Sequence, residues 1–121
     1  MEYSSVATHR SEEIAGVSFT VRKVSLGGRL ELARRIRQIG IKREFHAAGG
    51  TIDDDLEVAI IEHEINRAYL EWGLVAVSGL QLDGAEANTE ALILHGPEKL
   101  TNEILGVIRR ELSLSEEERK N

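Results

Sequence analysis

The sequence contains no cysteine and very few aromatic residues: one tryptophan, two tyrosines and two phenylalanines among 121 residues. The absence of cysteine excludes disulfide bonds, thiolate metal sites and a cysteine nucleophile, and it favours a reducing compartment. The shortage of aromatic side chains argues against a nucleic-acid surface, because many such surfaces stack bases on aromatic rings.

Long hydrophobic runs are absent as well. No stretch approaches the roughly 20 consecutive apolar residues of a membrane-spanning helix. The first twenty residues include Glu2, Arg10, Glu12 and Glu13 and have no continuous apolar segment, unlike a secretory signal. We therefore expect a soluble, cytoplasmic protein. A chain of this length buries roughly two-thirds of its unfolded surface, which is enough for one core.

Charge is distributed unevenly along the chain. Residues 1–50 contain nine Lys or Arg against five Asp or Glu, whereas residues 51–121 contain six against sixteen. Either the two oppositely charged halves complement one another in the fold, or a basic helix binds an acidic partner or nucleic acid. The net charge of −6 argues against nucleic acid.

The pattern of apolar residues predicts a mainly helical α+β fold. Residues 1–15 show no clear periodicity and are expected to form a flexible N-terminal arm, followed by a single domain over residues 16–121. Apolar and polar residues alternate over residues 17–22, which predicts a half-buried strand.

Two long amphipathic helices are predicted next. Ser25 is a suitable N-cap for the first helix, which ends at Gly49-Gly50. Its apolar residues at helical spacing are Leu26, Leu30, Ala33, Ile36 and Ile39. Its candidate basic face consists of Arg29, Arg34, Arg35 and Arg37, and Lys42 and Arg43 extend this charge.

The second helix begins after the N-cap Thr51, with Asp53, Asp54 and Asp55 in its first turn, where they favour the positive end of the helix dipole. Gly73 is expected to end the helix as a left-handed C-cap. The apolar stripe predicted for this helix comprises Leu56, Ile60, Ile61, Ile65, Ala68, Tyr69 and Trp72.

The last third of the chain combines a small β element with short helices. A hairpin is predicted over residues 74–87, because Asp83-Gly84 favours a tight type I′ turn. Asn88 or Thr89 is expected to cap a brief helix over residues 91–95, and Pro97 begins another helix. Ser115 and Glu118 form a capping box that predicts a final helical turn.

Residues that could support catalysis are scattered. His63 lies between Glu62 and Glu64, but neighbours on a helix point about 100° apart, so the three do not bind one metal ion. Asp53 and Glu57 lie four positions apart, and the helix dipole explains them more simply than a shared cation does. We expect no enzyme activity, no metal and no cofactor.

Apolar residues are concentrated where the second helix ends and the hairpin begins. One interpretation is an ordinary core between helices and hairpin. The alternative is a partner-binding patch, because Trp and Tyr beside aliphatic residues are common anchors of protein interfaces. The candidate partner-binding residues are Tyr69, Trp72, Leu74, Val75, Val77, Leu80 and Leu82.

Two segments of the chain combine strand, helix and turn signals in a characteristic order. In residues 19–38, FTVRKVSLGGRLELARRIRQ, a strand leads into an Arg-rich helix. Residues 69–121 contain a helix ending in Trp-Gly-Leu, a Gly-Leu-x-Leu-Asp-Gly hairpin, a Gly-Pro-Glu helix start and a Ser-Glu-Glu-Glu tail. In these features the chain resembles the tail assembly chaperones of phages and prophages, a family of small proteins encoded among tail genes.

The resemblance implies a role without catalysis. Tail assembly chaperones bind the long helical tape-measure protein in the bacterial host cytoplasm, keep it soluble, and help tail-tube protein to polymerise around it. The expected mode of contact is a helix lying in a groove or on a patch. A surface of this kind also permits a homo-oligomer.

Two other classes of function remain open from the sequence. A structural tail-completion or connector subunit would share the same setting but stay in the virion as a ring. A small nucleic-acid-binding regulator would use the basic face of the first helix, and its binding would weaken steeply with added salt.

Overall fold

The computed structural model describes the backbone of residues 1–120, and the side chains in that range except those of residues 42, 43, 45, 46 and 114–120. The fold is α+β and mainly helical, as predicted. The chain divides into two compact units. One unit is residues 25–69, and the other combines residues 1–24 with residues 70–121.

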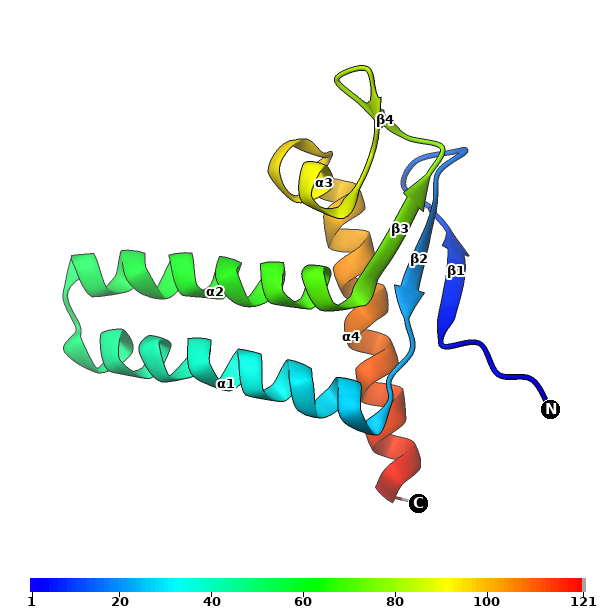
Figure 1. Cartoon of the computed structure of the whole chain (residues 1–121). Helices are drawn as coiled ribbons and strands as arrows, with labels where there is room; N and C mark the ends of the chain where they lie inside the picture. The colour runs from blue at the N-terminus through cyan, green and yellow to red at the C-terminus, as the bar shows by residue number, and fades with distance from the viewer. Residues whose placement is uncertain (121) are drawn as a thin grey trace. The chain divides into compact units, whose positions relative to one another are not determined.

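Residues 25–69 form a helical hairpin. Helix α1 (Leu26–Gly49) and most of helix α2 (Ile52–Gly73) run antiparallel, as Figure 1 shows. The predicted N-cap of α1 is confirmed, because the Ser25 side chain accepts a hydrogen bond from the Gly28 N–H at 3.0 Å. Helix α1 continues through Gly40 without interruption.

The turn between α1 and α2 is fixed by a reciprocal capping interaction. The Asp54 N–H donates to Thr51 Oγ1 at 3.0 Å, and that hydroxyl donates to the Asp54 carboxylate at 2.6 Å. Gly50 adopts a left-handed conformation with φ of 70°. A side chain on Gly49 would meet the Asp54 carboxylate, so the Gly-Gly pair is needed at this turn.

The unit formed by residues 1–24 and 70–121 contains an antiparallel sheet in the order β1-β2-β3. The strands are β1 (Val6–Arg10), β2 (Ser18–Arg22) and β3 (Leu74–Ser78). Strand β2 alternates buried and half-buried residues as predicted. The prediction of an arm over residues 1–15 missed β1, where Ala7 and His9 oppose Val21 and Phe19 of β2.

Helix α4 (Glu98–Lys120) completes the core of this unit. It follows Pro97, as predicted, and continues as one helix through the position of the expected separate final turn. The side chains of Ser115 and Glu118, which define the predicted capping box, lie outside the described residues. The fully buried residues of α4 include Leu100, Ile104 and Ile108.

Gly73 serves a different purpose from the one predicted. It does not adopt a positive φ, and β3 begins directly after it. A Cβ at this position would lie 2.7 Å from Cδ1 of Ile108 on α4. Glycine is therefore needed because α4 packs closely against the helix end, and not because the backbone is left-handed.

The predicted hairpin over residues 74–87 is only partly correct. Residues 74–78 pair with β2 instead, because β3 belongs to the three-stranded sheet. The hairpin consists of β4 (Gln81–Leu82) and β5 (Ala85–Glu86). Asp83 and Gly84 at its turn both have positive φ, 53° and 85°, as the type I′ prediction requires.

The loop after β1 is held by Glu103 of α4. The Glu103 carboxylate accepts hydrogen bonds from the Ser11 hydroxyl at 2.6 Å and from the Glu12 N–H at 2.7 Å. The same Ser11 hydroxyl accepts a hydrogen bond from the Ile14 N–H at 3.0 Å. One carboxylate thus connects the sheet loop to the helix.

We expect Glu103→Ala to lower the free energy of unfolding by about 1.5–3 kcal/mol, the usual range for hydrogen bonds to a charged group. Chemical denaturation measures this change. Glu98→Ala, an exposed position in the first turn of the same helix, is the matched control and should cost clearly less. Equal losses in the two variants would show that the Ser11 and Glu12 contacts contribute nothing.

Candidate partner-binding surfaces

Two of the predicted partner-binding residues, Trp72 and Leu74, are core residues. Both are buried in the unit that contains the sheet. The Arg22 guanidinium carbon lies 5.2 Å from the centre of the Trp72 ring, a cation–π contact with a strand residue. Trp72→Ala would therefore open the core, and it would not test a surface contact. The prediction of an exposed patch is wrong for these two residues.

The other predicted partner-binding residues do not form a continuous exposed patch. Tyr69, Val77, Leu80 and Leu82 are all half-buried. Only Val75 among the candidates is exposed. It is the extra residue of a bulge, because Leu74 and Ala76 oppose the adjacent residues Val21 and Thr20 of β2.

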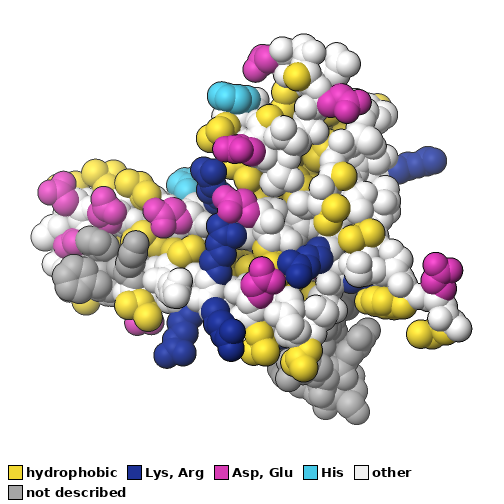
Figure 2. Space-filling model, in the orientation of Figure 1, with side chains coloured by type: hydrophobic (Ala, Val, Ile, Leu, Met, Phe, Trp, Pro, Cys, Tyr) yellow, Lys and Arg dark blue, Asp and Glu magenta, His cyan; other side chains and the backbone are white. Residues whose placement is uncertain are grey.

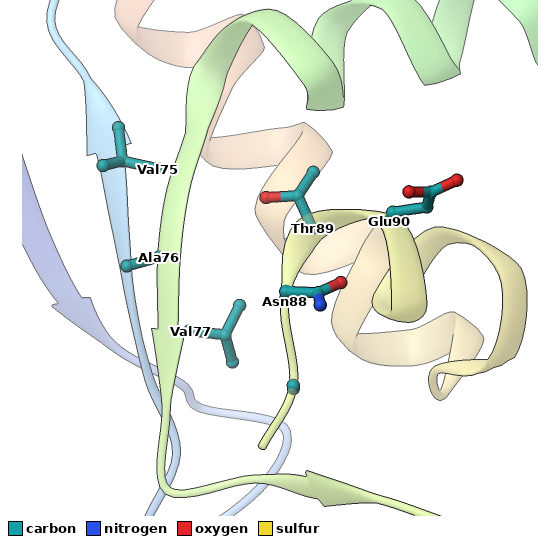
Figure 3. Close-up of a pocket in the computed structure, with 7 residues that line it drawn as sticks. Val75, Ala76, Val77, Asn88, Thr89 and Glu90 are labelled. Carbon is teal, nitrogen blue, oxygen red and sulfur yellow. The ribbon is translucent and has the colours of Figure 1, made fainter. Parts of the chain in front are cut away.

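A hollow of about 450 Å³ lies beside β3, the edge strand of the sheet. One wall is β3 from Val75 to Val77, and the other is residues 87–90. Figure 3 shows Val77 pointing from β3 toward the segment that contains Asn88. This segment leads into the short helix α3 (Thr89–His95).

Two polar residues that line the hollow, Asn88 and Thr89, make hydrogen bonds within the fold. Asn88 caps α3, since its Oδ1 accepts a hydrogen bond from the Ala91 N–H at 2.8 Å. The Thr89 hydroxyl donates to the Leu74 carbonyl at 3.3 Å. Glu90 supplies a single carboxylate at the rim. The hollow therefore offers an apolar strand wall, but it does not contain a set of convergent catalytic groups.

One exposed apolar surface of the helical hairpin lies on α2. We call Ile52, Leu56 and Ile60 the α2 stripe; their exposed fractions lie between 50% and 80%. They are four positions apart, so successive side chains are offset by only about 40° around the helix. The buried or half-buried residues Val58, Ile61, Ile65 and Ala68 lie on the opposite side of the same helix.

A second exposed apolar surface lies on α1. We call Leu26, Leu30 and Ile41 the α1 stripe; their exposed fractions lie between 49% and 76%. They project from one side of the helix, opposite the buried Leu32 and the half-buried Ile36 and Ile39. The prediction of one inward apolar face containing Leu26, Leu30 and Ala33 is therefore wrong, since all three are exposed.

The two stripes have flanks of opposite charge. Arg34 and Arg37 are exposed on the side of α1 that bears the α1 stripe, whereas Asp53, Glu57 and Glu64 form an exposed row along one flank of the α2 stripe. In Figure 2 acidic and hydrophobic side chains alternate along the α2 edge of the hairpin, and Lys and Arg side chains project from its α1 edge.

The predicted basic face of α1 is only partly presented to solvent. Arg34, Arg35 and Arg37 are exposed, and Arg29 is half-buried. Arg29 and Arg35 each have an interaction partner within the structure. The side chains of Lys42 and Arg43 lie outside the described residues.

Sequence reasoning missed the α2 stripe because it merged two faces of one helix. It grouped Leu56 and Ile60 with Ile61 and Ile65 as one apolar stripe. A wheel at 100° per residue separates them: 52, 56 and 60 fall on one side, and 58, 61, 65 and 68 on the other. Apolar residues on both sides of the helix were the available signal that one of the two faces stays exposed.

Possible metal ligands lie apart from one another in the described part of the chain. Among the side chains that the structure describes, no three His, Asp or Glu residues come close enough together to hold a metal ion. In the same part of the chain, no helix combines the length and apolar character that crossing a membrane requires. Comparisons with protein-family models, with curated proteins and with solved structures find no match.

Proposed function

We propose that this protein is a binding factor of the phage tail assembly chaperone type, acting in the bacterial cytoplasm. It covers an apolar stripe of a long helical tape-measure protein with its own α2 stripe, without making or breaking a covalent bond. The observation on which this proposal rests is that Ile52, Leu56 and Ile60 are exposed along one side of a helix.

The α2 stripe matches the kind of surface that a long helical client exposes. A long helical client exposes apolar side chains at intervals of three and four residues, and these side chains are not covered until the tail tube surrounds it. A helix that presents three large aliphatic residues four positions apart provides a complementary ridge. The similarity of residues 19–38 and 69–121 to tail assembly chaperones supports the choice of client.

The acidic flank of the α2 stripe adds a preference for charge. Asp53, Glu57 and Glu64 lie beside the apolar residues, so a client helix with Lys or Arg next to its apolar stripe is favoured. The net charge of −6 also keeps a client-bound complex dispersed through repulsion between copies.

The test uses the tape-measure protein of the phage or prophage that encodes this chain. We expect Leu56→Asp to reduce co-purification of that client at least about tenfold, because burying a leucine contributes about 1.5–3 kcal/mol and each 1.4 kcal/mol is a factor of ten. Leu94→Asp is the matched control: the two leucines are 59% and 55% exposed, both on helices.

The proposal fails if the Leu56→Asp protein, with an unchanged circular dichroism spectrum, still retains the client. It also fails if Leu94→Asp reduces retention to the same degree, since the loss would then reflect added negative charge and not the α2 stripe.

A further inference from the structure

We propose that the α2 stripe of one copy is covered by the α1 stripe of a second copy, in a head-to-tail contact that forms when no client is present. The inference deepens the proposed function, on which it rests for the role of the α2 stripe. It adds a specific occupant, a second copy of this chain, and a consequence, competition between self-association and client binding.

Both surfaces belong to the same helical hairpin, and the residues of both stripes are exposed in one copy. The α2 stripe occupies about the first two turns of α2, and the α1 stripe extends over most of α1. Both consist of large aliphatic residues on regular helices. Two such ridges pack through the standard interdigitation of helix surfaces.

The charges beside the α1 stripe and beside the α2 stripe are complementary. Arg34 and Arg37 lie on the side of α1 that bears Leu30 and Ile41. The exposed Glu44 lies on the same side, so a partner helix placed there meets two guanidinium groups and one carboxylate, a net positive charge. The α2 stripe offers the matching carboxylates of Asp53, Glu57 and Glu64. Opposite charges around an apolar contact fix its register and reject other pairings.

The alternative symmetric pairings are disfavoured by the same charges. Two α2 stripes placed against each other would bring two acidic rows together, and two α1 stripes would bring four arginines together. Like charges across an interface are unfavourable. The pairing of α1 with α2 is the one that matches both apolar and charged groups. Each stripe lies opposite the buried side of its own helix, so the two stripes of one copy face away from each other and cannot both contact the same partner copy. The contact is therefore heterologous.

A heterologous contact leaves one α1 stripe and one α2 stripe free at the two ends of any pair. Further copies therefore add, and they form a ring or an open chain. Three aliphatic side chains on each side place the contact among small, transient interfaces, which bury less than about 1,200 Å². We expect association that depends on concentration and weakens in about 1 M salt, where charges are screened over about 3 Å.

The deciding experiment mixes two variants of the full chain and follows mass by sedimentation velocity. Leu30→Asp removes the α1 stripe and keeps the α2 stripe, and Leu56→Asp does the reverse. Each variant alone should be monomeric at concentrations where the wild type associates. An equimolar mixture has one intact pair of stripes and should give a species of twice the monomer mass and nothing larger.

Several outcomes would overturn the inference. They are a wild type that stays monomeric throughout the dilution series, a mixture that stays monomeric while both variants remain folded by circular dichroism, and either variant alone associating like the wild type. The last outcome would indicate a symmetric contact between identical stripes. Leu94→Asp is the control for added charge and should associate like the wild type.

Leu30→Asp also separates this inference from the proposed function. It removes self-association but leaves the α2 stripe intact, so client retention should be unchanged or higher. If Leu30→Asp abolishes self-association and Leu56→Asp does not affect client retention, the self-contact is real and the proposed function is wrong. If both variants still self-associate while Leu56→Asp loses the client, only the further inference fails.

Discussion

Gly79→Ala is expected to destabilise the protein strongly, because a methyl group at this position meets both an unfavourable backbone conformation and a nearby backbone atom. Gly79 has φ of 80°, a region in which a side chain costs about 1–2 kcal/mol. In addition, the new Cβ would collide with the backbone carbonyl oxygen of Gly16 in the loop between β1 and β2. Backbone cannot move aside as a flexible side chain can, and overpacking adds about 1–3 kcal/mol.

The protein contains a matched control for this effect. Gly84 has φ of 85°, almost the same value, but nothing lies within 4 Å of a Cβ built on it. Gly84→Ala therefore measures the conformational cost alone, and the difference between the two variants measures the collision with Gly16. Chemical denaturation gives both values. If Gly79→Ala is no less stable than Gly84→Ala, the loop and β3 are not held as closely as the structure places them.

Much of the fold is predictable from local signals, and the confirmed features show why. Ser25, Thr51 and Asn88 cap helices as expected, because a cap depends only on a side chain and an N–H two or three residues away. The Asp83-Gly84 turn is likewise determined by the conformations that its own residues tolerate. These features do not require knowledge of distant parts of the chain.

Features that depend on distant contacts were not predictable in this way. Strand β1 carries Thr8, His9 and Arg10 without a clear alternation, and it becomes a strand by pairing with β2. The ring of His9 stacks on Phe19 at a centroid distance of 5.7 Å. In the sequence, Gly73 looks like a C-cap because it is a glycine at the end of a predicted helix. Its role is instead set by Ile108, thirty-five positions away.

Sequence patterns do not separate core from surface around Trp72, and the reason is physical. Aromatic and aliphatic residues near Trp72 are as suitable for a core as for an interface, and composition does not distinguish the two. The structure places Trp72 and Leu74 in the core and leaves Ile52, Leu56 and Ile60 exposed. The exposure of several aliphatic residues along one side of a regular helix is the observation on which the proposed contact rests.

The uneven distribution of charge along the sequence corresponds to a pattern of exposed charges on the helical hairpin. Basic residues of α1 and acidic residues of α2 are separated along the chain, and they also lie beside different apolar stripes. Arg37, for example, is exposed beside the α1 stripe, and Glu57 is exposed beside the α2 stripe. Complementary edges of this kind favour contacts between copies or with an amphipathic helix. They are a basis for the proposed competition between self-association and the client.

The second large effect is expected from Phe19→Ala. Phe19 is 1% exposed on β2, the central strand of the sheet, and its loss should lower the free energy of unfolding by about 3–5 kcal/mol. Because domains of this size are stable by only about 5–15 kcal/mol, this is a large part of the total. Thr20→Ala, a half-buried neighbour on the same strand, should cost much less.

Trp72 provides a probe for this experiment, since it is the only tryptophan and is buried in the unit that contains Phe19. Its fluorescence reports unfolding of the sheet unit, whereas circular dichroism at the helical band reports all helices together. In Phe19→Ala the fluorescence transition should move to lower denaturant concentration. If the circular dichroism transition occurs at a higher denaturant concentration than the fluorescence transition, the hairpin of residues 25–69 keeps its helices without the Phe19 core. If the two transitions coincide, the two units unfold together. An unchanged fluorescence midpoint would contradict the placement of Phe19 in the core.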